Sequence, residues 1–298
     1  MNWVVTSVIA AFFQNARSSV QKKLNSKMSL MASTYVRFSF SLPIILVLYF
    51  LYYQNIESFL SSLHTPKFLI YIFLGSIFQI SFTFLFLYLF KFTNFLVGTT
   101  LSKTEVIQVA LFEYIILSEN LNQLAVSGII ISTLGVIIFT TKDHKKIINN
   151  LFSKSTIIGI LCGTLLALSI VFFRGSMLEL NFLKSDFDKA FNALFFSTLI
   201  QTILITLYLV FFEKDQFKKI KNNFQLSCLA GLFGFLATFF WFYSFSIIHA
   251  AFVRAVGQVE LIFSYLSSRF LFKEKIRIIE IVGIIIFAAG ISLVLFFK

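Results

Sequence analysis

Two segments of the chain, residues 79–138 and 234–293, align without a gap at an offset of 155 residues. Each segment holds three apolar stretches, and the matching positions fall inside or beside them. The identical pairs include Thr83/Thr238, Phe84/Phe239, Tyr88/Tyr243, Glu105/Glu260, Glu119/Glu274, Gly128/Gly283 and Gly135/Gly290. A membrane chain that duplicates an odd number of helices places its halves in opposite orientations. The repeat therefore predicts two inverted halves around a shared centre.

The composition is that of a membrane protein. Hydrophobic residues make up 58% of the chain and charged residues 13%, and the mean hydropathy is +0.89. A soluble domain carries roughly 25% charged residues, so this chain lacks the polar residues that a water-facing surface needs. Strands of a barrel alternate in polarity, whereas these stretches are long and uniformly apolar. We expect membrane-spanning helices in the plasma (bacterial inner) membrane.

Ten apolar stretches approach the roughly 20 residues that a spanning helix needs. They cover residues 3–21, 30–53, 68–90, 94–117, 121–140, 155–177, 190–212, 225–246, 249–272 and 278–297. The predicted fold class is an all-α integral membrane protein with ten transmembrane helices in two inverted five-helix repeats. The first repeat is expected at residues 1–141 and the second at 155–298, with a polar linker at 142–154.

The formal net charge of +12 is spread over short loops. Fifteen basic residues follow odd-numbered stretches, and only three follow even-numbered ones. Because cytoplasmic loops carry the excess of Lys and Arg, this count places both termini on the outer side. The same rule explains the basic residues without a nucleic-acid partner. Cys162 and Cys228 show no disulfide or metal spacing, and no cofactor is expected.

Ionisable residues inside a span usually face a bundle interior or a cavity. The fourth and ninth stretches contain such residues and are therefore candidates for the functional site. In a continuous helix Lys103 and Glu105 lie about 200° apart, and so do their repeat mates Gln258 and Glu260. We expect one of these two faces to line a cavity. Glu105 and Glu260 are candidates for gating or proton coupling, with a symmetric structural contact as the alternative. Candidates for substrate binding are Asn15, Tyr88, Thr99, Lys103, Trp241, Tyr243, Arg254 and Gln258.

Arg17 and Arg174 can also be set against each other, at an offset of 157 residues. Both lie near the ends of apolar stretches, where long side chains usually extend to the membrane interface. We expect that position for them, a similar one for Arg37, and an interfacial position for Glu113.

Each three-helix segment carries a hydrophobic-x-Glu step and then paired glycines. The steps are Leu117-Ser118-Glu119 and Phe272-Lys273-Glu274, and the glycines are Gly128, Gly135, Gly283 and Gly290. In these features the chain resembles the ten-helix EamA-type members of the drug/metabolite transporter superfamily. Many members have a proline early in the fourth and ninth helices, but this chain has only Pro43 and Pro66. The resemblance implies cytoplasmic termini, in conflict with the charge count, and transport of small metabolites.

Together these features predict a secondary transporter that exports or exchanges small organic metabolites by alternating access around a central cavity. No Walker-type nucleotide loop appears, so a proton, a counter-substrate or the substrate gradient must drive it. Amino acids or related zwitterions are the first expectation, and S-adenosylmethionine or another nucleoside-like metabolite is the alternative. An integral-membrane lipid-modifying enzyme is the alternative from another class, but no clustered acids and histidines support one. The expected partners are a small-molecule substrate and the lipid bilayer, in a monomer or a homodimer.

Overall fold

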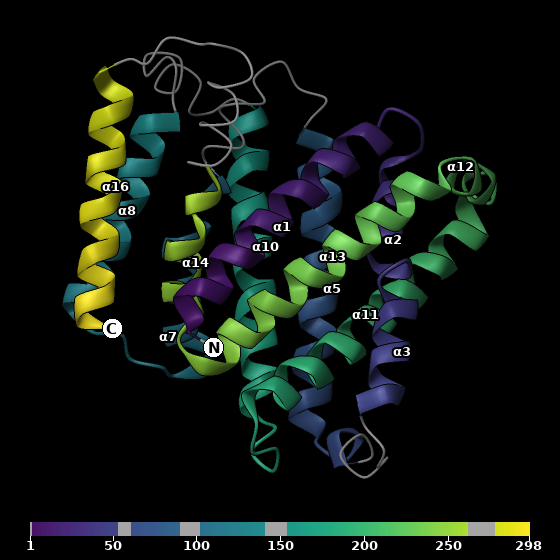
Figure 1. Cartoon of the computed structure of the whole chain (residues 1–298), viewed down its shortest axis with the longest axis horizontal. Coiled ribbons are helices and arrows are strands. Elements are labelled where there is room, and N and C mark those ends of the chain that lie inside the picture. Colours follow the sequence, from purple (N-terminus) through teal and green to yellow (C-terminus); the bar gives the residue numbers. More distant parts are fainter. Residues whose placement is uncertain (1, 53–60, 90–101, 141–153, 262–277) are drawn as a thin grey trace.

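The computed structural model describes residues 2–52, 61–89, 102–140, 154–261 and 278–298, and these ranges are helical without strands. The helices are α1 (Trp3–Leu24), α2 (Leu30–Ser39), α3 (Leu42–Tyr52), α5 (Pro66–Leu89), α7 (Glu105–Leu117), α8 (Gln123–Thr140), α10 (Lys154–Leu178), α11 (Asp186–Phe212), α12 (Gln216–Asn222), α13 (Phe224–Ile247), α14 (Ala250–Gly257) and α16 (Ile278–Phe297). Figure 1 shows them as one bundle, with both ends of the chain in the lower half of the view.

Five described helices are long and apolar enough to cross a membrane. They cover Leu30–Leu51, Pro66–Leu89, Thr156–Leu178, Asp186–Phe212 and Phe224–Ile247, and two shorter apolar helices cover Gln123–Ile138 and Ile281–Phe297. The first of these spans joins α2 and α3 across a turn at Phe40 and Ser41. Parts of the stretches predicted at 94–117 and 249–272 fall outside the described residues, as does most of the linker. The predicted repeat boundaries therefore stay a prediction.

The packing between helices shows a two-fold exchange. α1 packs along α13 and also contacts α14, whereas α10 packs along α5 and also contacts α7. α5 and α13 are the third helices of the two predicted repeats, and α7 and α14 belong to the fourth and ninth. Each repeat therefore lays its first helix against the third and fourth helices of the other. The pairs α7–α14 and α8–α16 join equivalent helices directly.

The paired glycines lie where α8 crosses α16, at the left of Figure 1. A Cβ atom on Gly135 would lie 2.3 Å from the backbone nitrogen of Phe287, and one on Gly290 would lie 2.3 Å from that of Ser132. Only glycine permits so close a backbone approach, which is typical of helix pairs in membranes. The repeated glycines therefore have a packing role.

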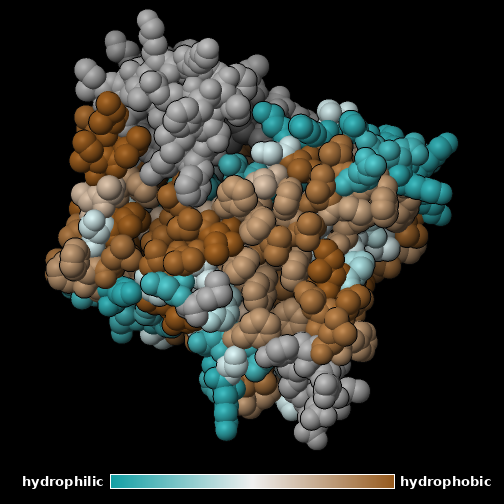
Figure 2. Space-filling view, in the orientation of Figure 1, coloured by the Kyte–Doolittle hydropathy of each residue, from teal (hydrophilic) through white to brown (hydrophobic). Residues whose placement is uncertain are grey.

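The outer surface of the bundle is apolar. In Figure 2 hydrophobic residues cover the middle of the visible face, and hydrophilic ones gather around α12 at the upper right. Large exposed side chains include Phe50, Leu51, Phe211, Phe212, Ile285 and Phe296. So much apolar surface marks a membrane-embedded protein.

Candidate functional site

A narrow cavity lies between the two repeats. It is lined by side chains of α1, α2, α5, α10, α13 and α14. The polar lining residues are Gln14, Arg17, Arg37, Gln79, Thr238 and Arg254, and the others are Phe82, Leu166, Ile170, Phe173, Trp241, Phe242 and Phe245. A central cavity at a repeat interface is the usual place for a transporter's substrate.

The fourth and ninth helices are interrupted beside this cavity. α7 begins at Glu105 after a turn at Lys103 and Thr104, and α14 ends at Gly257, followed by a turn at Gln258. Lys103 and Gln258 are repeat mates, so the interruption occurs at the same position in both repeats. Hydrogen bonds three residues apart tighten both turns, such as the one from the Gln258 nitrogen to the Ala255 oxygen (3.3 Å). The chain makes these breaks without proline.

Two ion pairs join the interrupted helices across the repeats. Arg254 donates to Glu105, with its Nε 3.1 Å from Oε1, and Lys103 pairs with Glu260. Glu105 and Arg254 are buried. Lys103 and Glu105, which were expected on opposite sides of one helix, therefore both pair with residues of the other repeat. The turns break the regular 100° step per residue on which that expectation depended.

Gln14 of α1 connects the second ion pair to Trp241. Its Nε2 donates to Glu260 Oε2 over 2.9 Å, and its Oε1 accepts a 2.9 Å hydrogen bond from the Trp241 indole. The guanidinium carbon of Arg254 lies 4.5 Å from the centre of the Trp241 ring, within cation–π range. A Cβ on Gly257 would lie 2.3 Å from that ring. The tryptophan is thereby fixed against the cavity.

Arg17 and Arg37 are buried in the cavity wall, with 5% and 4% of their surface exposed. Arg37 donates from Nη1 to the Thr83 hydroxyl over 2.8 Å. The Nε atoms of both arginines have no hydrogen-bond partner among the described residues. Neither arginine forms a salt bridge with any acid in the ranges that the structure describes. The expected interfacial position for Arg17 and Arg37 is wrong, because both side chains turn into the bundle.

A second charged cluster lies where the end of α7 meets the start of α14, and we call it the Arg174 cluster. It comprises Glu113, Glu119, Arg174 and His249. Arg174 donates to both oxygens of Glu119 over 2.6 and 2.8 Å, and its Nε lies 3.1 Å from Glu113. Its Nη1 also donates to the backbone oxygens of Phe245 and Ile248. The interfacial positions expected for Arg174 and Glu113 are therefore wrong.

Local backbone structure brings the two glutamates together. Ser118 ends α7 in the left-handed conformation, with φ 55°. The Ser118 and Glu119 nitrogens both bond back to the Glu113 oxygen, the latter over 3.3 Å, so the chain turns back over the helix end. The Glu113 carboxylate accepts the Ala250 and Ala251 N–H groups at the start of α14, over 2.6 and 3.1 Å. One repeat thus caps a helix of the other.

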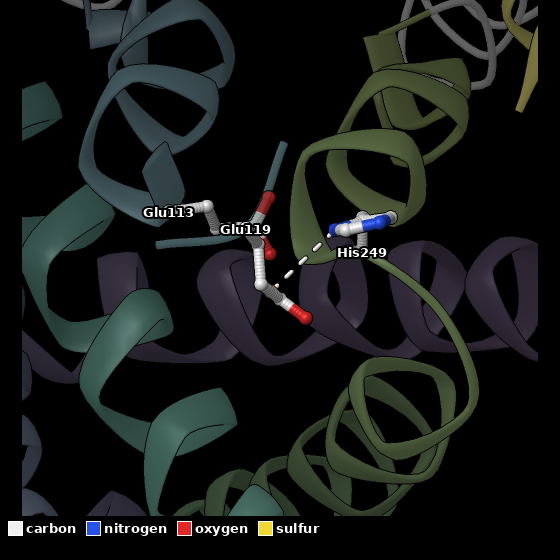
Figure 3. A group of neighbouring side chains, drawn as sticks. All are labelled: Glu113, Glu119 and His249. Atoms are coloured by element: carbon white, nitrogen blue, oxygen red, sulfur yellow. Dashed lines mark ion pairs between the residues drawn. The ribbon is translucent and has the colours of Figure 1, made fainter. Parts of the chain in front are cut away.

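Figure 3 shows His249 facing the two glutamates from the segment before α14. Its Nδ1 lies 3.5 Å from Glu119. Burial by itself raises the pKa of the Glu119 carboxyl group. The neighbouring His249 and Arg174 lower the pKa by more than burial raises it, and the resulting value is about 2. Glu113, Glu119 and His249 could offer metal ligands within 4.8 Å of one another. Arg174 already engages both carboxylates, however, and we assign no metal to the cluster.

The residues predicted to bind substrate divide into four groups. Trp241 and Arg254 line the cavity, and Lys103 and Gln258 lie at the helix interruptions beside it. Asn15, Tyr88 and Tyr243 are partly buried and are not among its lining residues. Thr99 lies outside the described residues. The cavity is also lined by Arg17, Arg37 and Gln79, which were not predicted there, although a buried polar residue in an apolar stretch is itself a signal.

Two matches to one family model cover residues 1–141 and 153–296, nearly the whole chain. The model is that of the EamA-like transporter family.

The chain belongs to the EamA-like transporter family.

The EamA family has a ten-helix membrane fold, and its members transport small molecules and are not enzymes. The predicted fold class, the resemblance and the absence of enzymatic activity are thereby confirmed. A solved structure titled only "Crystal structure of protein" matches 98% of this chain and 96% of its own, with a TM-score of 0.71 and 10% identity. At that identity the likeness shows the fold alone. No curated protein matches the chain significantly.

Proposed function

We propose that this EamA-family protein is a secondary transporter that exports or exchanges small organic metabolites by alternating access around the central cavity. The observation that carries the proposal is the cavity's position between the repeats, beside paired interruptions of the fourth and ninth helices. Discontinuous helices near the bilayer midplane provide polar backbone and side-chain groups for a substrate. We place the protein in the plasma (bacterial inner) membrane, with the basic loops in the cytoplasm.

Alternating access requires that contacts closing one end of the cavity break while others form. The Arg174 cluster suits the closed end, because it ties the end of α7 to the start of α14 across the repeats. The ion pairs Arg254–Glu105 and Lys103–Glu260 suit a gating role, because a shift of one repeat against the other must change them. Proton coupling through either glutamate is part of the proposal.

The proposed substrate is a small metabolite that carries a carboxylate or a similar anionic group. Amino acids and related zwitterions meet this description, as does S-adenosylmethionine, which stays the alternative. The aromatic wall formed by Phe173, Trp241 and Phe245 suits an apolar portion of the substrate.

Counterflow in proteoliposomes tests the proposal. Vesicles that contain the purified protein are loaded with candidate metabolites and diluted into trace labelled substrate. We expect saturable uptake that depends on the internal load and falls at least tenfold in Arg254→Ala. Uptake that is linear with concentration and indifferent to the internal load would indicate a channel and contradict the proposal.

The same assay tests proton coupling. Glu105→Gln or Glu260→Gln should change the pH dependence of uptake, because glutamine cannot exchange a proton. Identical pH profiles for both variants and the unmodified protein would exclude the coupling role and leave the glutamates as gating residues.

A further inference from the structure

The central cavity carries more positive than negative charge. Its wall and the adjoining helix interruptions present four cationic side chains, Arg17, Arg37, Lys103 and Arg254. Among described residues only two acids, Glu105 and Glu260, face this group. The described part of the site therefore holds two more positive charges than negative ones.

Both acids already form ion pairs with cations other than Arg17 and Arg37. Glu105 is the partner of Arg254, and Glu260 accepts from Lys103 and from the Gln14 amide. Glu260 attracts Arg17 through space, but Arg254 repels it, and Arg17 in turn repels Arg37. The two excess charges thus fall on the two arginines that have no salt bridge in the described ranges.

Buried charges are normally paired, because removal from water is costly without a partner. Arg17 and Arg37 lie on different helices and line the same cavity, each with a buried Nε that lacks an acceptor in the part of the chain that the structure describes. A guanidinium group has a planar fork of donors that matches carboxylate and phosphate oxygens. A ligand with such oxygens would satisfy these donors and offset the excess charge.

The remaining lining favours an organic rather than an inorganic anion. Leu166, Ile170, Phe173, Phe242 and Phe245 form an apolar wall, with the Trp241 ring beside it. An ammonium group, by contrast, finds no uncommitted carboxylate among the described lining residues.

We infer that Arg17 and Arg37 form the head-group site for an organic anion, and that the transported substrate carries a carboxylate or phosphate group and an apolar body without a compensating ammonium. This inference rests on the proposed transport function. Among metabolites that carry an anionic group, it selects those without an ammonium group, and so excludes the zwitterions.

The fluorescence of Trp241 provides a direct binding assay. The chain has two tryptophans, Trp3 and Trp241, and Trp3 is not among the lining residues of the cavity. In a Trp3→Phe background, Trp241 emission reports the cavity alone. The matched probes are 3-phenylpropanoate and phenylalanine, which differ only in the ammonium group, with phenyl phosphate as the second anion. A low-chloride buffer keeps small anions from competing.

We expect 3-phenylpropanoate or phenyl phosphate to change the emission saturably, with phenylalanine at least tenfold weaker. Arg17→Gln and Arg37→Gln should each weaken anion binding at least tenfold, since each removes a charged fork. Arg17→Lys should weaken it less, because it keeps the charge. Lys23→Gln, an exposed basic position on the same helix as Arg17, is the matched control and should change nothing.

Three results overturn the inference: phenylalanine binds as tightly as 3-phenylpropanoate, anion binding ignores both arginines, or neither anion binds saturably. Counterflow with the same compounds separates the two proposals. Arginine-dependent binding of an anion that is never transported contradicts the transport function and leaves the anion site. Transport of phenylalanine but of neither anion supports a transporter and overturns the anion site.

Discussion

Arg17 and Arg174 can be aligned as equivalent residues of the first helices of the two repeats, yet their surroundings differ. Both side chains are 5% exposed. Arg174 reaches two glutamates and two backbone oxygens where the end of α7 meets the start of α14. Arg17 lines the central cavity, and its Nε has no hydrogen-bond partner within the described ranges.

The difference shows how an inverted repeat can give the same residue type two roles at equivalent positions of its two halves. The donors of Arg174 are engaged in holding the repeats together. Arg17 keeps its charge and its hydrogen-bonding capacity available inside the cavity, at a cost in stability that a purely structural position would not need. Stability measurements on the two arginines therefore distinguish a structural role from a ligand-binding one.

The largest expected effect belongs to Arg174→Gln. Removal of one member of a buried ion pair costs about 3–5 kcal/mol, because the partner's charge stays buried without compensation. We expect a loss of that order in the free energy of unfolding, measured by denaturant titration in mixed micelles. Arg174→Lys, which keeps the charge but loses the bidentate geometry, should lose less. A change below about 1 kcal/mol would mean that the Arg174 cluster contributes little to stability.

Glu113→Gln should have the next largest effect. The glutamate is fully buried, caps the first N–H groups of α14 and faces Arg174. Glutamine keeps one acceptor oxygen but loses the charge, so we expect a loss of about 2 kcal/mol, the value typical of a hydrogen bond to a charged group. The same denaturant titration measures it. An equal loss in Glu113→Ala would show that the charge, not the remaining acceptor, provides the stabilisation.

The sequence predicted much of the architecture. The repeat identified equivalent helices, and the apolar stretches gave the helices to within a few residues where the structure describes them. Polar residues in apolar stretches also located part of the site, since Trp241 and Arg254 line the cavity and Lys103 and Gln258 lie beside it. These features depend on composition and spacing, which a single sequence contains.

The partners could not be predicted, for two physical reasons. The separation of Lys103 from Glu105 assumed a continuous helix, but a turn without proline breaks it. The positions of Arg17 and Arg174 were inferred from their distance to the ends of apolar stretches. Whether a long side chain extends outward to the interface or inward to a cavity depends on neighbouring helices, which the linear sequence does not specify.

Acid should weaken the Arg174 cluster through Glu119. Its pKa in the folded protein, about 2, lies below the unfolded value of roughly 4.3. The carboxylate therefore stabilises the fold above pH 4.3, and this contribution is lost as the pH falls toward 2. We expect Glu119→Gln to cost about 1–2 kcal/mol at pH 7, a value reduced for partial exposure, and progressively less at lower pH. A cost independent of pH between 7 and 3 would contradict the role of its charge.

The smallest effect, and the one of opposite sign, is expected for Arg17→Gln. If the Arg17 charge is buried without compensation in the absence of ligand, a neutral side chain of similar length removes a desolvation penalty. We expect the free energy of unfolding to rise by up to about 1 kcal/mol in ligand-free protein, since glutamine still needs a hydrogen-bond partner.

Thermal unfolding of the unmodified protein and of the variant, each without and with 3-phenylpropanoate, measures this effect. The unmodified protein should be stabilised by the ligand and the variant should not, because only a ligand that binds the folded state stabilises it. A variant clearly less stable than the unmodified protein without ligand would show that Arg17, like Arg174, holds the fold together, and the distinction between the two arginines would no longer stand.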